Sequence, residues 1–447
     1  MTEQERSIPA VMDLSLRIGE LLLDNGAGAA DVTATMQAVA YHHGLRTAIV
    51  DVTFTTLSIS YQATQDDAPM TQIRTVKQRE IDYEDLTRID HLVRDILADR
   101  VDVAEARAEV ARLTSSGHHR HRAAITLGWG VMCAGVAFML GGEWIVCALA
   151  FVSAMLIDRT QHAMARRRLP TFYLQVVGGA IATLLAVGAA AAEWEVDPSL
   201  VVTANIIMLL SGIGFMGGLQ DALTGFYITA GARMTEALLS TAGIIAGVTG
   251  GLSVGTVLGV EVGRLNPGAF GLESWPVLAL GGAISAAAFA YASYSPKRVL
   301  VPIAVIAAIG ILITNYVELA GFGRPWAVAT ASFFVGLVAF SAAGAVRVPP
   351  LVVVVSAVVP MLPGLSIYRG LSLLAEGDGH TSRGLLAVIT AASVALAIAA
   401  GVILGEYIAQ PLKREARKIE TRLSGPRLVG PLRLRSGRAS RRRTAEE

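Results

Sequence analysis

A glycine-interrupted segment from Gly212 to Glu236 carries the residue types best suited to binding a small charged molecule. Its polar side chains are Gln220, Asp221, Thr224, Tyr227, Thr229, Arg233, Thr235 and Glu236. An arginine pairs bidentately with a carboxylate, and an aspartate or glutamate holds an ammonium group or a transported proton. The segment predicts a substrate or coupling site formed by Gly212, Asp221, Thr224, Arg233 and Glu236. The alternative is a hairpin in which Asp221, Arg233 and Glu236 pair only with one another.

A later stretch of the chain offers further candidates of the same kind. It contains Gly364, Arg369 and Arg383, beside Ser366, Tyr368, Gly370 and His380. Asn205 and Asn315 differ from these, because each interrupts an apolar run. Inside an apolar helix, an asparagine binds either a polar group of a substrate or a neighbouring helix. Both roles stay open for both residues.

The sequence predicts no cofactor, no metal site and no catalytic residue. The chain has no Gly-Lys pair, so it lacks the Walker A loop that cradles nucleotide phosphates. His118, His119 and His121 flank arginines in a basic cluster that is typical of a membrane surface. Cys133 and Cys147 both lie in apolar runs, which argues against a disulfide framework or a cysteine metal site.

The composition excludes an ordinary soluble enzyme. Of the 447 residues 53% are hydrophobic and 16% are charged, whereas soluble domains carry about 25% charged residues. Residues 411–447 hold 12 basic side chains against 4 acidic ones. We interpret them as a disordered basic tail beside anionic lipid, and we expect no nucleic-acid partner.

Ten stretches without Asp, Glu, Lys or Arg follow Arg122. They are 123–142, 144–157, 169–192, 198–220, 237–260, 274–296, 299–317, 325–346, 348–368 and 384–405. A hydrocarbon core of about 30 Å is spanned by roughly 20 apolar residues as a helix. The pattern predicts an α-helical polytopic membrane protein with ten transmembrane helices.

Basic residues predict the orientation of these helices. If the N-terminus is inside, the inner connections carry Arg159, Arg166, Arg167, Arg168, Arg233, Lys297, Arg298 and Arg347, and the basic tail joins them. The outer connections carry only Arg264, Arg324, Arg369 and Arg383. By the positive-inside rule, both termini are cytoplasmic and the protein spans the plasma membrane many times.

The apolar part repeats itself. Leu210-Ser211-Gly212 with Gly218 matches Leu362-Pro363-Gly364 with Gly370 at an offset of 152 residues. Small residues at every fourth position also recur, at Gly243, Gly247, Gly251, Gly255 and Gly259 and again at Ser393, Ala397, Gly401 and Gly405. Such ridges let helices pack closely in lipid. We predict two five-helix halves, 123–262 and 274–410, which insert in opposite orientation as an inverted repeat.

Residues 1–122 are predicted to form a separate cytoplasmic α+β domain. Apolar residues with helical spacing precede Asn25-Gly26, and a second helix follows Asp31 as far as Gly44. Alternating residues from Val50 to Tyr61 and from Ile73 to Lys77 indicate strands. Asp82 indicates the start of a third helix. Asp102 with Glu105 resembles a capping box at the start of a fourth helix.

The order of these parts resembles the threonine/serine exporter family of actinobacteria. The resemblance rests on Leu21-Leu22-Leu23-Asp24-Asn25-Gly26, Ala30-Asp31-Val32 and Met36, on the ten spans, and on the paired Ser211-Gly212 and Pro363-Gly364 segments. It covers nearly the whole chain as far as Gln410, although Ser211 stands where the family's Pro is expected. The resemblance implies a protein that lies in the lipid bilayer and exports L-threonine and L-serine, with protons as the coupling ion.

A physical account of such export assigns roles to the candidate residues. Arg233 or Arg383 would face the substrate carboxylate, Asp221 or Glu236 the ammonium group or proton, and Thr224 or Asn205 the hydroxyl group. Two alternatives stay open. One is export of small dicarboxylates such as succinate, and the other is a membrane-anchored hydrolase or sensor acting through residues 1–122. The oligomeric state, a homo-oligomer included, also stays open.

Overall fold

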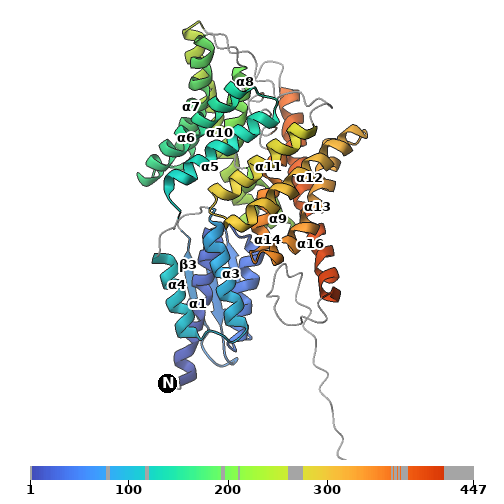
Figure 1. The fold of residues 1–447 in the computed structure, drawn as a ribbon. Coiled ribbons are helices and arrows are strands. Elements are labelled where there is room, and N and C mark those ends of the chain that lie inside the picture. Colours follow the sequence, from blue (N-terminus) through green and yellow to red (C-terminus); the bar gives the residue numbers. More distant parts are fainter. Residues whose placement is uncertain are drawn as a thin grey trace, which may run out of the picture.

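The computed structural model describes residues 3–76, 81–115, 120–192, 197–209, 212–259, 275–363 and 381–416, with the single residues 366, 370 and 373. Residues 3–115 form a group that we call the N-terminal unit, and the helices from Arg122 onward form the membrane unit (Figure 1). The N-terminal unit consists of α1 (Glu3–Asp24), α2 (Ala29–His42), β1 (Ile49–Thr53), β2 (Thr56–Tyr61), β3 (Met70–Thr75), α3 (Tyr83–Leu97) and α4 (Val103–Ser115).

The helix ends of the N-terminal unit follow local sequence signals. α1 ends just before Gly26, whose φ of 93° lies in the left-handed region that glycine tolerates best. Asp82 caps α3 by accepting hydrogen bonds from two backbone N–H groups of its first turn. The capping box of α4 is also present, because the Glu105 N–H donates to Asp102 at 2.7 Å and the Asp102 N–H donates to Glu105 at 3.2 Å.

The three strands form an antiparallel sheet in the order β1-β2-β3. Alternate residues, among them Val52, Leu57 and Ile59, are buried in the core that α1 and α2 share with the sheet. β3 begins three residues before the predicted strand, because Met70 already pairs with Tyr61 of β2. The sheet thus has one covered face, as the alternation predicts.

Asp13 of α1 joins three elements of the N-terminal unit. Its carboxylate accepts charged hydrogen bonds from Arg17 at 3.0 Å, from Arg74 of β3 at 3.2 Å and from Arg107 of α4 at 2.9 Å. Burial by itself would raise the pKa of Asp13, but the hydrogen bonds from Arg17 and Arg107 outweigh it. The pKa of this carboxyl group therefore lies below its ordinary value.

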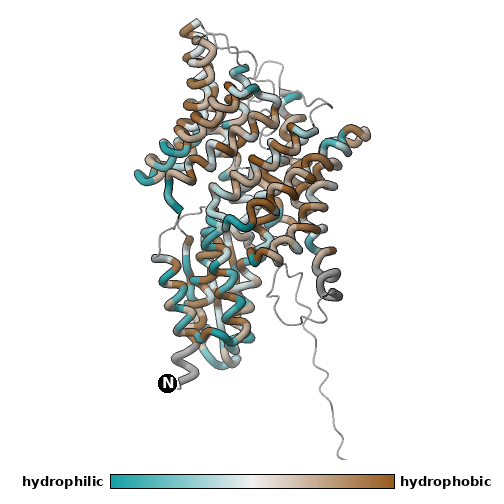
Figure 2. The backbone as a smooth tube through the Cα atoms, viewed as in Figure 1, coloured by the Kyte–Doolittle hydropathy of each residue, from teal (hydrophilic) through white to brown (hydrophobic). Residues whose placement is uncertain are grey.

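Eight helices among the described residues are long and apolar enough to cross a membrane. They are α5 (Arg122–Met139), α6 (Trp144–Arg166), α7 (Thr171–Ala191), α10 (Tyr227–Val257), α11 (Trp275–Ala292), α12 (Leu300–Leu319), α13 (Arg324–Ala345) and α16 (Thr381–Ala416). Figure 2 shows how strongly apolar residues dominate them in comparison with the N-terminal unit. The chain is thus an α-helical membrane protein.

The other predicted spans correspond to shorter helices. α8 (Pro198–Leu209) and α9 (Gly212–Leu223) meet at an angle of 44°. If this bent pair crosses the membrane as a single span, it is the ninth. α14 (Pro350–Val358), followed by η3 (Val359–Met361), is apolar but shorter than a span. All ten predicted stretches overlap a helix, and the described residues support eight spans, or nine with the bent pair.

The helices of the membrane unit pack in a pattern that occurs twice. α5 packs on α6, α6 on α7, and α7 on both α8 and α10. In the same order α11 packs on α12, α12 on α13, and α13 on both α14 and α16. α5 and α11 pack against each other and so join the two groups.

Glycines lie at the corresponding close contacts of both groups. A Cβ atom at Gly247 of α10 would lie 2.0 Å from the Val176 carbonyl oxygen of α7. A Cβ atom at Gly405 of α16 would lie 2.4 Å from the Phe333 carbonyl oxygen of α13. The predicted ridges of small residues therefore include the positions where these helix pairs approach most closely.

The N-terminal unit contacts the membrane unit directly through α3. The Tyr83 N–H donates to the Ser293 carbonyl at 3.0 Å, and its ring packs edge-on against Phe289 of α11. Farther along α3, His91 Nε2 lies 3.0 Å from the Arg347 carbonyl oxygen. These contacts hold the first turns of α3 against the ends of α11 and α13.

Candidate functional site

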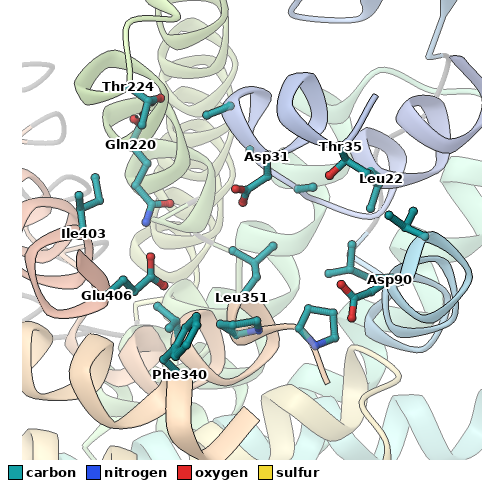
Figure 3. Close-up of a pocket in the computed structure, with 18 of the residues that line it drawn as sticks. Leu22, Asp31, Thr35, Asp90, Gln220, Thr224, Phe340, Leu351, Ile403 and Glu406 are labelled. Atoms are coloured by element: carbon teal, nitrogen blue, oxygen red, sulfur yellow. Dashed lines mark hydrogen bonds between the residues drawn. The ribbon is translucent and has the colours of Figure 1, made fainter. Parts of the chain in front are cut away.

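A cavity of about 130 Å³ lies where the N-terminal unit meets the membrane unit (Figure 3). Its walls come from α1, α2 and α3 on one side and from α9, α13, α14 and α16 on the other. The lining residues include Leu22, Ala27, Gly28, Asp31, Thr35, Asp90, Arg94, Gln220, Asp221, Thr224, Phe340, Leu351, Ile403 and Glu406. An engineered apolar cavity of about 150 Å³ admits benzene. The cavity in this protein can therefore hold a molecule of several heavy atoms.

The polar lining is mostly acidic. Its charged groups are Asp31, Asp90, Arg94, Asp221 and Glu406, and its other hydrogen-bonding side chains are Thr35, Gln220 and Thr224. Arg94 is already paired, because its guanidinium lies 2.8 Å from the carboxylate of Asp90, which is on the preceding turn of α3. The arrangement suits a small molecule that carries a positive charge.

Glu406 is the acid that α16 brings to the cavity. It has 8% of its surface exposed, although it lies within the apolar span Ser382–Ala409. Its carboxylate points into the cavity, towards the side chain of Gln220 on α9 (Figure 3). Within the described part of the chain, Glu406 makes neither a hydrogen bond nor an ion pair.

Asp221 and Arg233 form a buried ion pair of 2.8 Å, in which their side chains are 2% and 10% exposed. The pair forms locally because Gly225, with φ of 95°, reverses the chain between α9 and α10. The alternative reading of the sequence, a hairpin of Asp221, Arg233 and Glu236, thus has its Asp221–Arg233 pair, whereas Glu236 is exposed. The structure adds that this pair is buried rather than solvated.

The same ion pair binds the connection between α1 and α2. The Ala29 N–H donates to Asp221 Oδ1 at 3.0 Å, and Arg233 donates to the Ala27 carbonyl at 3.1 Å. A Cβ atom at Gly28 would lie 3.5 Å from Asp221 Oδ1. The pair thus holds residues 27–29 at the edge of the cavity.

A second contact fixes the β1–β2 turn to the start of α10. The Phe54 N–H donates to Thr229 Oγ1 at 2.9 Å. Phe54 itself has φ of 51°, so the turn uses a left-handed residue at this point. The segment singled out in the sequence therefore binds the N-terminal unit at two places.

The structure brings only some of the predicted site residues together. Asp221 and Thr224 line the cavity, and Arg233 lies behind it in the ion pair. Glu236 and Arg383 are exposed and do not line it.

The predicted asparagines also lie away from this cavity. Asn205 of α8 is fully buried and donates to the Val201 carbonyl of its own helix at 2.8 Å. Asn315 of α12 is half-buried.

Gly212 is the first residue of α9, whereas Gly364, Arg369, His118 and His119 lie outside the described residues. His121 caps α5 by accepting from the Ala123 N–H at 3.3 Å. Within the described residues, no three His, Cys, Asp or Glu side chains are placed to hold a metal ion.

Sequence reasoning missed Glu406 and Asp31 as cavity residues, and it named Gln220 only among the polar side chains of the Gly212–Glu236 segment. Glu406 directly follows the predicted apolar stretch 384–405, and an acid at the end of such a stretch was a usable signal. Asp31 lies in the first turn of α2, where acids are common for helix-dipole reasons alone. Its position beside the cavity follows only from the tertiary contact.

Comparison with known proteins assigns a family. A family model described as "Putative threonine/serine exporter" matches residues 13–255, and one described as "Threonine/Serine exporter, ThrE" matches residues 279–408. The chain belongs to the threonine/serine exporter family. The two matches of this exporter family divide the chain between α10 and α11, where the two packing groups of the membrane unit also separate.

Two similar relatives carry the same name. A protein of Mycobacterium tuberculosis, named "Probable threonine/serine exporter", is 37% identical over 93% of this chain and 80% of its own length. A protein of Corynebacterium glutamicum, named "Threonine/serine exporter", is 33% identical over 92% of this chain and 84% of its own length. No solved structure matches this exporter-family chain.

Proposed function

We propose that this protein exports L-threonine and L-serine from the cytoplasm as a secondary transporter driven by the proton motive force. The names of its relatives support the substrates. The observation that carries the proposal is the cavity with mostly acidic charged groups at which α9, α13, α14 and α16 of the membrane unit meet the N-terminal unit. Binding sites between two repeats are characteristic of secondary transporters.

The proposed architecture has ten spans, arranged as inverted halves 123–262 and 274–410. The repeated packing order and the glycine contacts in both groups support the repeat. Residues 1–122 form the cytoplasmic domain and residues 411–447 the basic cytoplasmic tail. This orientation rests on the distribution of basic residues, and it puts the cavity at the cytoplasmic side of the membrane unit.

The substrate's chemistry sets what the site must supply. A zwitterion with a hydroxyl group needs partners for three polar groups, because each one left unpaired after desolvation costs roughly 1–3 kcal/mol. The cavity offers carboxylates for the ammonium group, and the side chains of Thr35, Gln220 and Thr224 for the others. Rocking of one half against the other then alternates access to the two sides of the membrane.

The ion pair changes the role that we propose for two residues. Asp221 and Arg233 neutralise each other in this conformation and bind the α1–α2 connection. We assign them a positioning role, in which they hold the N-terminal unit against the cavity. Arg369 and Arg383 stay candidates for the substrate carboxylate in other conformations of the cycle.

The charge of the cavity favours an amino acid over a dicarboxylate. Among the described lining residues there are four acids and one arginine, and this arginine is paired with Asp90. A dicarboxylate such as succinate would meet repulsion from like charges, which in a low-dielectric site is strong. An ammonium group would be attracted by the same field.

The test is transport of labelled L-threonine in proteoliposomes of the purified full-length protein, with and without an imposed proton gradient. L-serine and succinate are the competitors. The proposal predicts gradient-driven movement of threonine that serine blocks and succinate does not. Movement or competition by succinate alone would refute the substrate, and no movement under any gradient would direct attention to hydrolysis or ligand binding by residues 1–122.

A further inference from the structure

We infer that Glu406 is the carboxylate at which the substrate's ammonium group and the coupling proton compete, and that Asp31 of the N-terminal unit completes this site. The inference rests on the proposed function and names the chemistry of its site. It makes the N-terminal unit part of the substrate site.

The burial of Glu406 is the first observation. Its side chain extends from an apolar helix, is more than nine-tenths buried, and points into the cavity on the side where Gln220 lies. A buried carboxylate without a partner is expensive in free energy. A position of this kind is retained when a ligand or a proton supplies the missing partner.

The position of Asp31 is the second observation. It lines from α2 the same cavity that Glu406 lines from α16 (Figure 3). Two ion pairs also lie at the cavity, Asp90 with Arg94 and Asp221 with Arg233. α13 and α14 contribute apolar residues such as Phe340 and Leu351. Two like charges that share a site favour a cation or a proton between them.

The chemistry of the lining selects a primary ammonium group as that cation. The described residues provide no group of three ligands placed for a metal ion. The volume of about 130 Å³ fits a small organic molecule. The amide of Gln220 lies on the Glu406 side of the cavity and the hydroxyl of Thr35 on the Asp31 side, so the remainder of an amino acid would find hydrogen-bonding partners nearby (Figure 3).

Competition at one carboxylate is sufficient for coupling. When the amino acid binds from the cytoplasmic side, the Glu406 carboxyl group releases its proton to that solvent and its carboxylate accepts hydrogen bonds from the ammonium group. When the site opens to the outside, a proton from that solvent replaces the departing amino acid. Each exported amino acid is then exchanged for one incoming proton, and no other bond is formed or broken.

The first test uses Glu406→Gln in proteoliposomes, with Glu143→Gln as the matched control. Glu143 is an exposed glutamate of the membrane unit that lies outside the cavity. The inference predicts that Glu406→Gln lowers gradient-driven threonine transport at least about tenfold, since a charge-assisted hydrogen bond and the proton acceptor are both lost. Glu143→Gln is expected to transport as the wild type does. Equal transport by Glu406→Gln and the wild type would overturn the inference and leave the proposed function standing.

A second measurement requires no variant of the site. Threoninamide keeps the ammonium group without the carboxylate, and 3-hydroxybutanoate keeps the carboxylate without the ammonium group. The inference predicts that threoninamide competes with labelled threonine in the wild-type protein and that 3-hydroxybutanoate does not. The reverse order would overturn it, and a wild type that moves no threonine at all would overturn both this inference and the proposed function.

A third measurement separates coupling from folding. Threonine added to the wild-type protein in weakly buffered detergent solution should release protons, which a pH indicator detects. Glu406→Gln should release none while keeping the melting temperature of the wild type.

Asp31→Asn should weaken threonine binding at least about tenfold, whereas Asp66→Asn, on an exposed turn of the same unit, should not. If Glu406→Gln released as many protons as the wild type, the inference that the proton and the ammonium group share Glu406 would be wrong.

Discussion

Breaking the buried ion pair between Asp221 and Arg233 should destabilise the junction of the two units. The two side chains are 2% and 10% exposed, and each also makes a hydrogen bond to the α1–α2 connection. Asp221→Asn keeps the shape of the side chain and leaves Arg233 as an uncompensated buried cation. Removing one partner of such a pair costs about 3–5 kcal/mol, whereas removing both charges is far less destabilising.

The assay is a double-mutant cycle with Asp221→Asn, Arg233→Gln and the double variant. The free energy of unfolding is measured for each protein in a denaturing-detergent titration. We expect a coupling free energy of about 1–3 kcal/mol. The control cycle uses Glu318 and Arg324, an ion pair of 3.6 Å whose side chains are 30% and 43% exposed, and its coupling should stay below about 1 kcal/mol.

Equal coupling in the two cycles would refute the argument from burial. The same variants also test function, because the pair positions the α1–α2 connection beside the cavity. Threonine transport in proteoliposomes should fall in both single variants. Retained transport in both Asp221→Asn and Arg233→Gln would remove the positioning role that we propose for these residues.

Three further predictions concern other parts of the chain. Gly247→Ala should destabilise the protein in thermal unfolding, because its Cβ would meet the α7 backbone at 2.0 Å, whereas Gly250→Ala, with nothing within 4 Å, should be neutral or slightly stabilising. Asp13→Asn should be destabilising at neutral pH. Since the pKa of Asp13 is lowered in the folded state, its contribution is complete above the ordinary value of 3.8 and is lost as the pH falls through the lower folded value, which acid titration of the two proteins can follow. Truncation after residue 425 should leave export intact in the proteoliposome assay, and loss of export would show that the basic tail takes part in transport.

Local signals in the sequence determined most of the helices and their ends. Ten apolar stretches, the cap at Asp82 and the capping box at Asp102 all correspond to elements of the structure. These signals are readable because hydrophobicity, helix capping and glycine turns act over a few residues of the chain. The glycine ridge around Gly247 is readable for the same reason, since its spacing repeats every helical turn.

The count of spans was less well determined by the sequence. Apolar composition does not distinguish a long helix from the bent pair α8–α9 or from the short α14. Whether an apolar stretch continues, bends or stops depends on what packs against it. The prediction of ten spans therefore stays a prediction beyond the eight or nine that the described residues support.

The sequence by itself determined an α-helical membrane protein, and its motifs pointed to the exporter family. It also predicted two similar halves and an N-terminal α+β domain. Only the tertiary structure decided which polar residues share a site. It paired Asp221 with Arg233 against the N-terminal unit and brought Glu406 into one cavity with Asp31, although 375 positions separate these two acids. The physical reason is that burial and electrostatic environment arise from contacts between distant segments, which local periodicity does not encode.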